Sequence, residues 1–424
     1  MNQQAAASAP PTVSLHGKCV ILGATAIALL ATPLAAPAMP QIARMFADQA
    51  SSEPFARAIL AAISILPGEP SVSFLVKFIL LSVPALFIVV SAPASGWFCD
   101  RFGRKLLLNL SLLVFAVGGT SGYFADSFLT LFIGRAILGL AIAGIKTASV
   151  AMVGDLFTGA ERNRFIGWQG SALKIGGVIF MVLGGYLANV SWQAPFLGYL
   201  LAFLVLPSGL YAIAESLPEG AGHKHLKGEA PAVPFWPATW VFVSATLASG
   251  LFFITPVQLP FFVINNFGAS PSDAGNAIAV GNTVGALIAL TYHRFRGRLN
   301  FQAIYAFIFL FMGLGYFGLT LAPTYQMALP AMIVAGLGFG LYVPNHSAWI
   351  LSVVGPSQRG FGVGLVTTAM FLGQFLAPII VQPLIVAGHP AAVWQSISGL
   401  LFALAALYAG LAWLVARKPR AATV

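Results

Sequence analysis

Long runs of apolar residues, separated by short polar stretches, recur along the whole 424-residue chain. A helix needs about 20 predominantly apolar residues to cross roughly 30 Å of hydrocarbon. Twelve runs reach this length, at about 19–46, 73–98, 105–124, 128–153, 165–189, 193–214, 236–264, 272–292, 300–321, 326–353, 361–386 and 392–416. The first run has no basic leader and no clear cleavage site, so we expect a membrane span there and not a cleaved signal.

Composition narrows the class of protein. Charged residues make up 8% of the chain and hydrophobic residues 58%, whereas soluble domains carry about 25% charged residues. Two cysteines, Cys19 and Cys99, are too few for a disulfide framework or a four-ligand metal site. The sequence therefore predicts an all-α integral membrane protein with no cofactor and no metal.

The positive charges predict an orientation. With the N-terminus in the cytoplasm, most lysines and arginines fall on the cytoplasmic side, and only Arg44, Arg57 and Lys77 fall outside. The net charge of +10 is spread over short loops and forms no single patch, which argues against binding of nucleic acid. We expect both termini in the cytoplasm, in a bacterial cytoplasmic (inner) membrane.

The chain divides into two similar halves. The expected parts are a cytoplasmic tail (1–18), a six-helix bundle (19–214), a cytoplasmic linker (215–235), a second six-helix bundle (236–416) and a C-terminal tail (417–424). The linker is rich in Gly, Pro and charge, so its His223 and His225 are interpreted as solvated residues and not as a metal pair. The loop 96–105 is echoed at 289–298, and the loop 159–167 at 355–364. This repetition favours two pseudo-symmetric bundles around a central cavity.

The loop GWFCDRFGRK (96–105) resembles the signature that the major facilitator superfamily carries between its second and third helices. The twelve-span layout agrees with that family, and the stretch APAMPQIARMF (36–46) resembles its drug and proton antiporter branch. The resemblance implies a conformational gate formed by Gly96, Asp100, Arg101, Gly103, Arg104 and Lys105. The alternative is that these charges only fix the topology. In the fifth span, Phe180 and Met181 replace the Gly-Pro pair of the antiporter signature.

Three cations lie deep inside predicted spans, away from the span ends. Lys146 lies nine residues before Asp155 and Lys174 ten after Arg164, so both are about 13–15 Å from the cytoplasmic ends of their helices. Arg135 lies eleven residues before Lys146 and has almost the same bearing on the helix. A charge at the bilayer centre costs about 2.5–3.5 kcal/mol, and every one of the eleven acidic residues lies at a span end or in a loop. An incoming anion is the simplest complement, although structural or neutral lysines, and a structural Arg135, are the alternatives.

The second half offers polar groups at similar depth. Pro344 is expected to interrupt the tenth span beside Tyr342, Asn345 and His346, and His346 could carry a proton. Gln258 and Gln374 are further candidates for substrate contact. Because no acidic residue lies within a span, any coupling proton would use His346, a lysine or the substrate itself, and exchange against a counter-anion or uncoupled facilitation are the alternatives.

The functional hypothesis is a secondary transporter that moves a small or medium organic anion by alternating access, with a monomer expected from the family. The alternative is an exporter of lipophilic or neutral compounds, which the 34 phenylalanines would suit. An enzyme is not expected, because His346 has no nucleophile or base near it in the pattern. The long segment 47–72, which contains the helical pattern FARAILAAISIL, is expected to form an interfacial helix or a lid.

Overall fold

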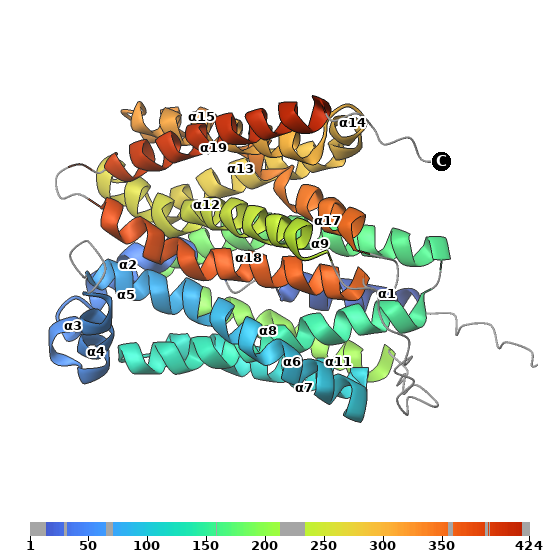
Figure 1. Cartoon of the computed structure of the whole chain (residues 1–424). Helices are drawn as coiled ribbons and strands as arrows, with labels where there is room; N and C mark the ends of the chain where they lie inside the picture. Colours follow the sequence, from blue (N-terminus) through green and yellow to red (C-terminus); the bar gives the residue numbers. More distant parts are fainter. Residues whose placement is uncertain are drawn as a thin grey trace, which may run out of the picture.

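The computed structural model describes residues 14–28, 32–64, 71–157, 159–212, 234–354, 359–385, 389 and 391–417. Every regular element in this part of the chain is a helix (Figure 1). The first half (residues 14–212) contains α1 (Leu15–Ile27), η1 (Ala36–Ala38), α2 (Met39–Met45), α3 (Gln49–Ser52), α4 (Pro54–Ile63), α5 (Val72–Lys77), η2 (Phe78–Ser82), α6 (Val83–Phe102), α7 (Arg104–Thr120), η3 (Ser121–Phe124), α8 (Phe128–Leu156), α9 (Gly159–Val190), α10 (Ala194–Leu197), η4 (Gly198–Leu201) and α11 (Ala202–Ala212). The second half (residues 234–417) contains α12 (Phe235–Phe267), α13 (Pro271–Leu290), α14 (Tyr292–Arg296), α15 (Phe301–Thr320), α16 (Tyr325–Phe339), α17 (Tyr342–Val353), α18 (Arg359–Val381), η6 (Gln382–Leu384) and α19 (Ala392–Arg417).

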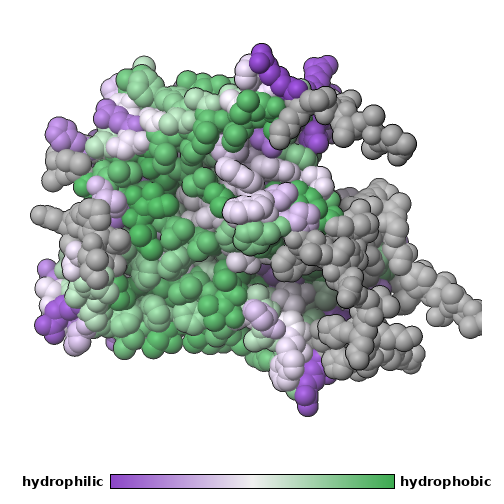
Figure 2. Space-filling view, viewed as in Figure 1, coloured by the Kyte–Doolittle hydropathy of each residue, from purple (hydrophilic) through white to green (hydrophobic). Residues whose placement is uncertain are grey.

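The lengths of these helices suit a bilayer. Among the described residues, nine helices are long and apolar enough to cross a membrane, and three shorter apolar helices cover Leu15–Ile27, Ile175–Val190 and Ala194–Gly209. Apolar side chains cover the middle of the face in Figure 2, and hydrophilic ones gather toward both ends of the helices. The predicted all-helical class is confirmed, whereas most of the expected linker and both tails' outer residues lie outside the described part.

The first expected span is interrupted. Instead of one helix over 19–46, α1 ends at Ile27 and the chain becomes helical again only at Ala36, with residues 29–31 outside the described part. Pro33, Pro37 and Pro40 follow in this stretch, and each lacks the N–H that a helical ladder requires. The expected break in the tenth span is confirmed: α16 ends at Phe339 and α17 begins at Tyr342, two residues before Pro344.

The second span contains a π-helical turn. It follows Lys77 directly and runs from Phe78 to Ser82 between α5 and α6. Pro84 comes just after this turn, and its ring would clash with the carbonyl four residues earlier in a regular helix. A wider turn removes that clash, and such π-helical turns occur often at functional sites.

Each half is held together mainly by its own helices. In the first half α8 packs against α6 and α7, and in the second half α15 packs against α16 and α19 while α12 packs against α18. The halves meet where α9 lies against α13 and where α6 and η2 lie against α18. Glycines permit the first of these approaches, since a Cβ at Gly185 would come within 2.9 Å of Ser272 Cα and one at Gly275 within 2.8 Å of the Met181 carbonyl.

The segment between the first two spans forms two short helices, α3 and α4, at one end of the molecule (Figure 1). Glu53 joins them, and its carboxylate accepts hydrogen bonds from the backbone N–H groups of Phe128 (2.8 Å) and Leu129 (2.9 Å) at the start of α8. Phe55 stacks edge-on against Phe132, with 5.1 Å between ring centroids. The expected helix is therefore present and is fixed to α8. We call this end of the molecule the hairpin end and the opposite end, where the described chain starts and finishes, the terminal end.

Candidate functional site

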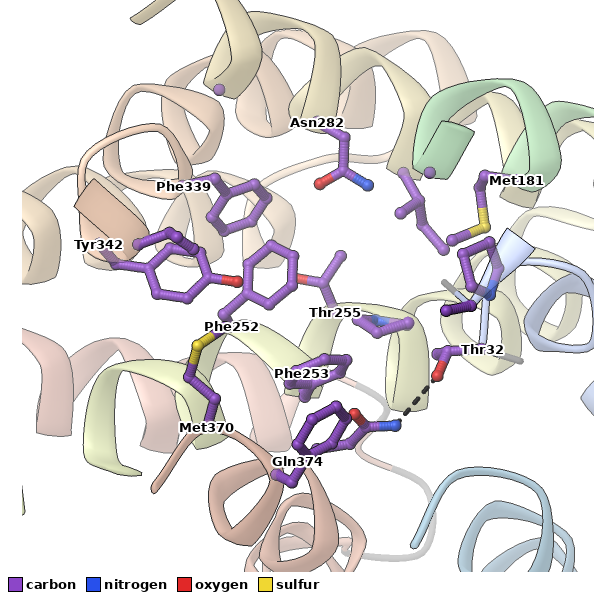
Figure 3. Close-up of a pocket in the computed structure, with 18 of the residues that line it drawn as sticks. Thr32, Met181, Phe252, Phe253, Thr255, Asn282, Phe339, Tyr342, Met370 and Gln374 are labelled. Atoms are coloured by element: carbon purple, nitrogen blue, oxygen red, sulfur yellow. Dashed lines mark hydrogen bonds between the residues drawn. The ribbon is translucent and has the colours of Figure 1, made fainter. Parts of the chain in front are cut away.

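A cavity of about 290 Å³ lies between the two halves. Its walls come from the segment after α1 and from α6, α8 and α9 of the first half, and from α12, α13, α16, α17 and α18 of the second half. Most of the wall is apolar, and aromatic rings on α12 and around the α16–α17 break face into it (Figure 3). The residues that line it are Ala28, Thr32, Pro33, Pro84, Ile88, Ile142, Lys146, Gly177, Met181, Phe252, Phe253, Thr255, Pro256, Ile278, Asn282, Gly285, Ala286, Phe339, Tyr342, Val343, Met370, Phe371 and Gln374.

Lys146 supplies the charge of this cavity. It projects from α8, is partly exposed, and holds its Nζ 4.3 Å from the centroid of the Phe371 ring on α18. No carboxylate belongs to the described residues that line the cavity. A cation against an aromatic face gains about 0.5–2 kcal/mol but keeps its full charge. The site is therefore an apolar, aromatic chamber with one ammonium group.

Gln374 is a neutral polar group of the cavity wall that contacts the other half of the protein. Its Nε2 donates to Thr32 Oγ1 at 3.0 Å (Figure 3) and to the Leu81 carbonyl at 3.2 Å, so it joins α18 to the first half. Thr255 bonds to the buried Tyr316 hydroxyl at 2.7 Å. Gln374 and Tyr342, both predicted from the sequence, thus lie in the wall together with Lys146.

Arg135 lies elsewhere, although it shares the bearing of Lys146 on α8. It is fully buried and donates to Tyr199 Oη (3.0 Å), to the Gly119 carbonyl (2.8 Å) and to the Gly118 carbonyl (3.3 Å). A Cβ at Gly119 would clash with the Tyr199 ring. These bonds link α8 to α7 and η4. They agree with the alternative interpretation of Arg135 as a residue that stabilises the fold.

The remaining candidates of the second half lie behind the cavity wall. Asn345 is fully buried and donates to the Phe301 carbonyl (3.1 Å) while accepting from the Tyr292 hydroxyl (3.2 Å). His346 is also fully buried, 5.6 Å from the Tyr342 ring, and neither of its ring nitrogens has a partner among the described residues. Neither residue belongs to the lining, so substrate could reach them only after the wall moves.

Gln258 contacts a buried lysine. Its Oε1 accepts a 2.6 Å hydrogen bond from Lys77 Nζ, and Lys77 is only 2% exposed. The structure buries this side chain of α5 against α12, which the sequence did not indicate, and the expected place of Lys77 on the outer side of the membrane stays a prediction. A lysine close to the start of a span is ordinarily a flanking charge that reaches the interface, so the pattern gave no signal of burial.

Lys174 belongs to α9, three residues before the cavity residue Gly177. Its side chain lies outside the described residues. Its expected contact with an anion stays a prediction.

The residues of the expected gate, 96–105, cover the last turns of α6 and the turn that leads into α7. Gly103 adopts φ 99°, which favours glycine, and Arg104 pairs with Asp155 at the end of α8 (2.8 Å) while donating to the Cys99 carbonyl (3.2 Å). Arg101 is exposed and lies over the Trp97 ring at 5.5 Å. Gly96 has open space beside it, since a Cβ there would meet no atom within 4 Å. Lys105 is half-buried, and the Asp100 side chain lies outside the described residues.

Hydrogen bonds between the halves close the hairpin side of the cavity. Arg44 donates to Asn265 Oδ1 at 2.9 Å, and Asn189 donates to Ser272 Oγ at 2.9 Å. The Lys77 bond to Gln258 and the Gln374 bonds add to this set, as does Ser82 Oγ, which donates to the Phe375 carbonyl at 2.7 Å. At the terminal end, Lys18 pairs with Glu161 at 2.8 Å within the first half.

Membrane-length helices in two halves, with a cavity shared between them, define a membrane transport protein. The chain belongs to the Major Facilitator Superfamily, whose family model matches residues 21–378 and, in a second match, 241–424. It is therefore an integral membrane transporter and not an enzyme, and the resemblance stated from the loop 96–105 is confirmed.

Among curated proteins, the chain is 26% identical to Multidrug resistance protein 1 of Bacillus subtilis (strain 168) over 301 residues, which cover 70% of this chain and 77% of that protein. It is 24% identical to Quinolone resistance protein NorA of Staphylococcus aureus (strain COL) over 334 residues, 75% of this chain and 83% of that protein. Among solved structures, a D-xylose-proton symporter superposes with a TM-score of 0.70 at 15% identity, covering 93% of this chain and 97% of that one.

Proposed function

We propose that this protein is a secondary transporter that moves amphipathic organic anions by alternating access. In this proposal twelve spans form two six-helix bundles, residues 19–214 and 236–416, whose termini face the cytoplasm of a bacterial cell. The halves rock about the cavity, as is usual in transporters built from repeats. The single observation that carries the proposal is the Lys146 ammonium in the cavity wall.

Electrostatics supports an anionic substrate. An ammonium group deep in a membrane protein costs several kcal/mol unless it has a partner or an aqueous cavity. The partner recorded for Lys146 among the described residues is the neutral Phe371 ring, and no carboxylate joins it in the lining. A carboxylate or sulfonate that enters the cavity would supply the missing negative charge.

The apolar walls limit what else the substrate can be. Phe252, Phe253, Phe339 and Phe371 surround the same space, and Tyr342 stacks on Phe252 with 5.0 Å between centroids. Such walls favour an aromatic or lipophilic body, because its burial gains roughly 25 cal/mol per Å². The cavity therefore suits a molecule with one anionic group and an apolar remainder.

A second candidate function is export of neutral lipophilic compounds. The apolar lining favours it, and the relatives named above are multidrug and quinolone resistance proteins. The two functions differ in one respect: export of a neutral compound has no use for the charge of Lys146.

The test compares two probes of almost the same shape. Naphthalene-2-sulfonate stays ionised at all working pH values, and naphthalene-2-sulfonamide is its neutral counterpart. In proteoliposomes we expect saturable uptake of the sulfonate. Lys146→Met should weaken sulfonate binding about 10- to 150-fold, which corresponds to a charge-assisted bond of roughly 1.5–3 kcal/mol.

Lys146→Arg is the matched control, because it keeps the charge at the same position. We expect Lys146→Arg to retain most of the sulfonate uptake. The affinity for the neutral sulfonamide should be the same in Lys146→Met as in the parent. Equal sulfonate uptake by the parent and the Met variant would overturn the anion proposal. The same assay on Lys174→Met tests the sequence-based prediction for that residue.

A further inference from the structure

Lys77 is a buried cation at the boundary between the two halves. Its Nζ donates to Gln258 Oε1 at 2.6 Å and lies 4.4 Å from the centroid of the Phe261 ring, both on α12. These partners are neutral, and no ion pair to Lys77 is recorded in the described chain. The amide and the ring moderate the cost of burying the charge but leave it without a counterion.

The backbone beside Lys77 is also unusual. The π-helical turn Phe78–Ser82 begins at the next residue, and its Leu81 carbonyl accepts a hydrogen bond from Gln374 at 3.2 Å. Ser82 in the same turn donates to the Phe375 carbonyl at 2.7 Å. Both bonds run to α18, so the second half clasps the first immediately next to the buried ammonium.

Lys77 lies between the cavity and the hairpin end. On its own span it precedes the cavity residue Pro84 by seven residues, about 10 Å of helix. On α12, Gln258 follows the cavity residue Thr255 by three residues, about 5 Å. One route from the cavity toward the hairpin end, between the second span and α12, therefore runs past the Lys77–Gln258 contact.

We propose that Lys77 is a second anion-binding group, which takes the anionic group of the substrate when the halves separate at the hairpin end. This inference rests on the proposed function. When α12 moves away with the second half, Gln258 and Phe261 leave with it, and the ammonium stays on the first half at the newly opened mouth. Lys146 then binds the anion in the central cavity and Lys77 binds it on the hairpin side.

A simple latch would not need a charge at this position. A neutral donor such as glutamine could bond to Gln258 without the desolvation cost of an ammonium that is 2% exposed. A lysine has an advantage over a neutral donor if its charge binds substrate in the conformation that is open at the hairpin end. Phe74 and Phe78, whose rings stack at 5.8 Å, provide apolar surface next to Lys77 in the sequence for the body of an amphipathic substrate.

The experiment measures transport of naphthalene-2-sulfonate at each face separately. Right-side-out and inside-out membrane vesicles present the hairpin end and the terminal end to the bath, respectively. Lys77→Gln should raise the KM at the hairpin-end face at least tenfold and change the KM at the terminal-end face less than twofold. Lys77→Arg should keep both KM values near those of the parent.

Gln258→Leu is the matched control, because it removes the same hydrogen bond but leaves the ammonium. If Lys77 binds anions, this variant changes turnover through the gate and leaves the hairpin-face KM within twofold of the parent value. Equal KM changes in Lys77→Gln and Gln258→Leu would show that Lys77 is only a latch and would overturn the inference. An unchanged hairpin-face KM in Lys77→Gln would also overturn it.

If Lys77→Gln does not fold, a chemical charge-rescue measurement tests the same inference. Lys77→Cys is placed in a chain whose Cys19 and Cys99 are serine, and it is labelled with 2-aminoethyl methanethiosulfonate or with neutral methyl methanethiosulfonate. Recovery of the hairpin-face KM by the charged reagent alone supports the anion site, and equal effects of the two reagents refute it. Loss of Lys146-dependent sulfonate transport in the parent would instead defeat the proposed function itself.

Discussion

Arg135 should contribute to stability and not to substrate affinity. Its guanidinium is fully buried, donates three hydrogen bonds to Tyr199, Gly119 and Gly118, and lies 5.2 Å from the Phe196 ring and 5.0 Å from the Tyr199 ring. It is absent from the lining of the cavity. The perturbation is Arg135→Ala, with Tyr199→Phe as a smaller change in the same cluster.

The expected magnitude follows from these contacts. Hydrogen bonds between membrane helices contribute about 0.6 kcal/mol on average and up to about 1.7 kcal/mol, so three bonds amount to roughly 2–5 kcal/mol. Each aromatic contact adds about 0.5–1 kcal/mol. Removal of the guanidinium also relieves its own desolvation cost, which offsets part of this loss. We expect a net loss of about 3 kcal/mol for Arg135→Ala and about 1 kcal/mol for Tyr199→Phe.

The assay is reversible unfolding in mixed micelles by titration with dodecyl sulfate, followed by naphthalene-2-sulfonate binding to the folded fraction. Both variants should unfold at lower detergent fractions and should bind the sulfonate with the parent affinity. Lys146→Met should show the opposite result, with parent stability and weakened binding. A stable Arg135→Ala protein that binds the sulfonate tenfold more weakly would refute the structural assignment and restore the sequence-based one.

Two further predictions concern the turn at Gly103, measured by the same unfolding assay, and the contact of Glu53 with α8, measured by proteolysis. Gly103→Ala should lower the free energy of unfolding by about 1–2 kcal/mol, because a residue with a Cβ is strained at φ 99°. Gly96→Ala is the control and should be neutral or slightly stabilising, because its Cβ would meet no atom within 4 Å. Equal losses of stability in both variants would contradict this reasoning. Glu53→Gln should remove the charged acceptor of the Phe128 and Leu129 N–H groups and weaken the attachment of the α3–α4 segment to α8 by about 0.5–2 kcal/mol. The measurement is limited proteolysis, in which the α3–α4 segment of this variant should be cleaved faster. Ser51→Ala, which changes an exposed neighbour, should be cleaved at the parent rate.

The helical fold could be predicted because period and length of the apolar runs are properties of the sequence alone. The break near Pro344 was predicted because proline lacks the N–H that a helix requires, and the helix after Glu53 because apolar residues recur there at helical spacing. The interruption of the first span was not, since three prolines in an apolar run are also compatible with a kinked continuous helix. Packing against neighbouring helices, which the sequence does not show, decides between these two outcomes.

The site was predicted only in part. Lys146 could be found, because a charge in a long apolar run is conspicuous, but its aromatic partner could not be chosen among 34 phenylalanines. Arg135 has the same bearing on α8, yet tilted helices meet different neighbours at different depths, so the two cations contact different elements. Burial of Lys77 depends on α12, which comes 181 residues later at Gln258.

The π-helical turn in the second span also affects how this chain should be aligned with its relatives. A π-helical turn holds one residue more than an α-helical turn, so it accommodates one extra residue while the helix on either side keeps its bearing. A relative with a one-residue gap within 78–82 should therefore form a regular helix in which the matching lysine still faces α12. A relative with no gap and a regular helix here would have that lysine rotated by about 100° away from α12, and it should lack the second lysine's role.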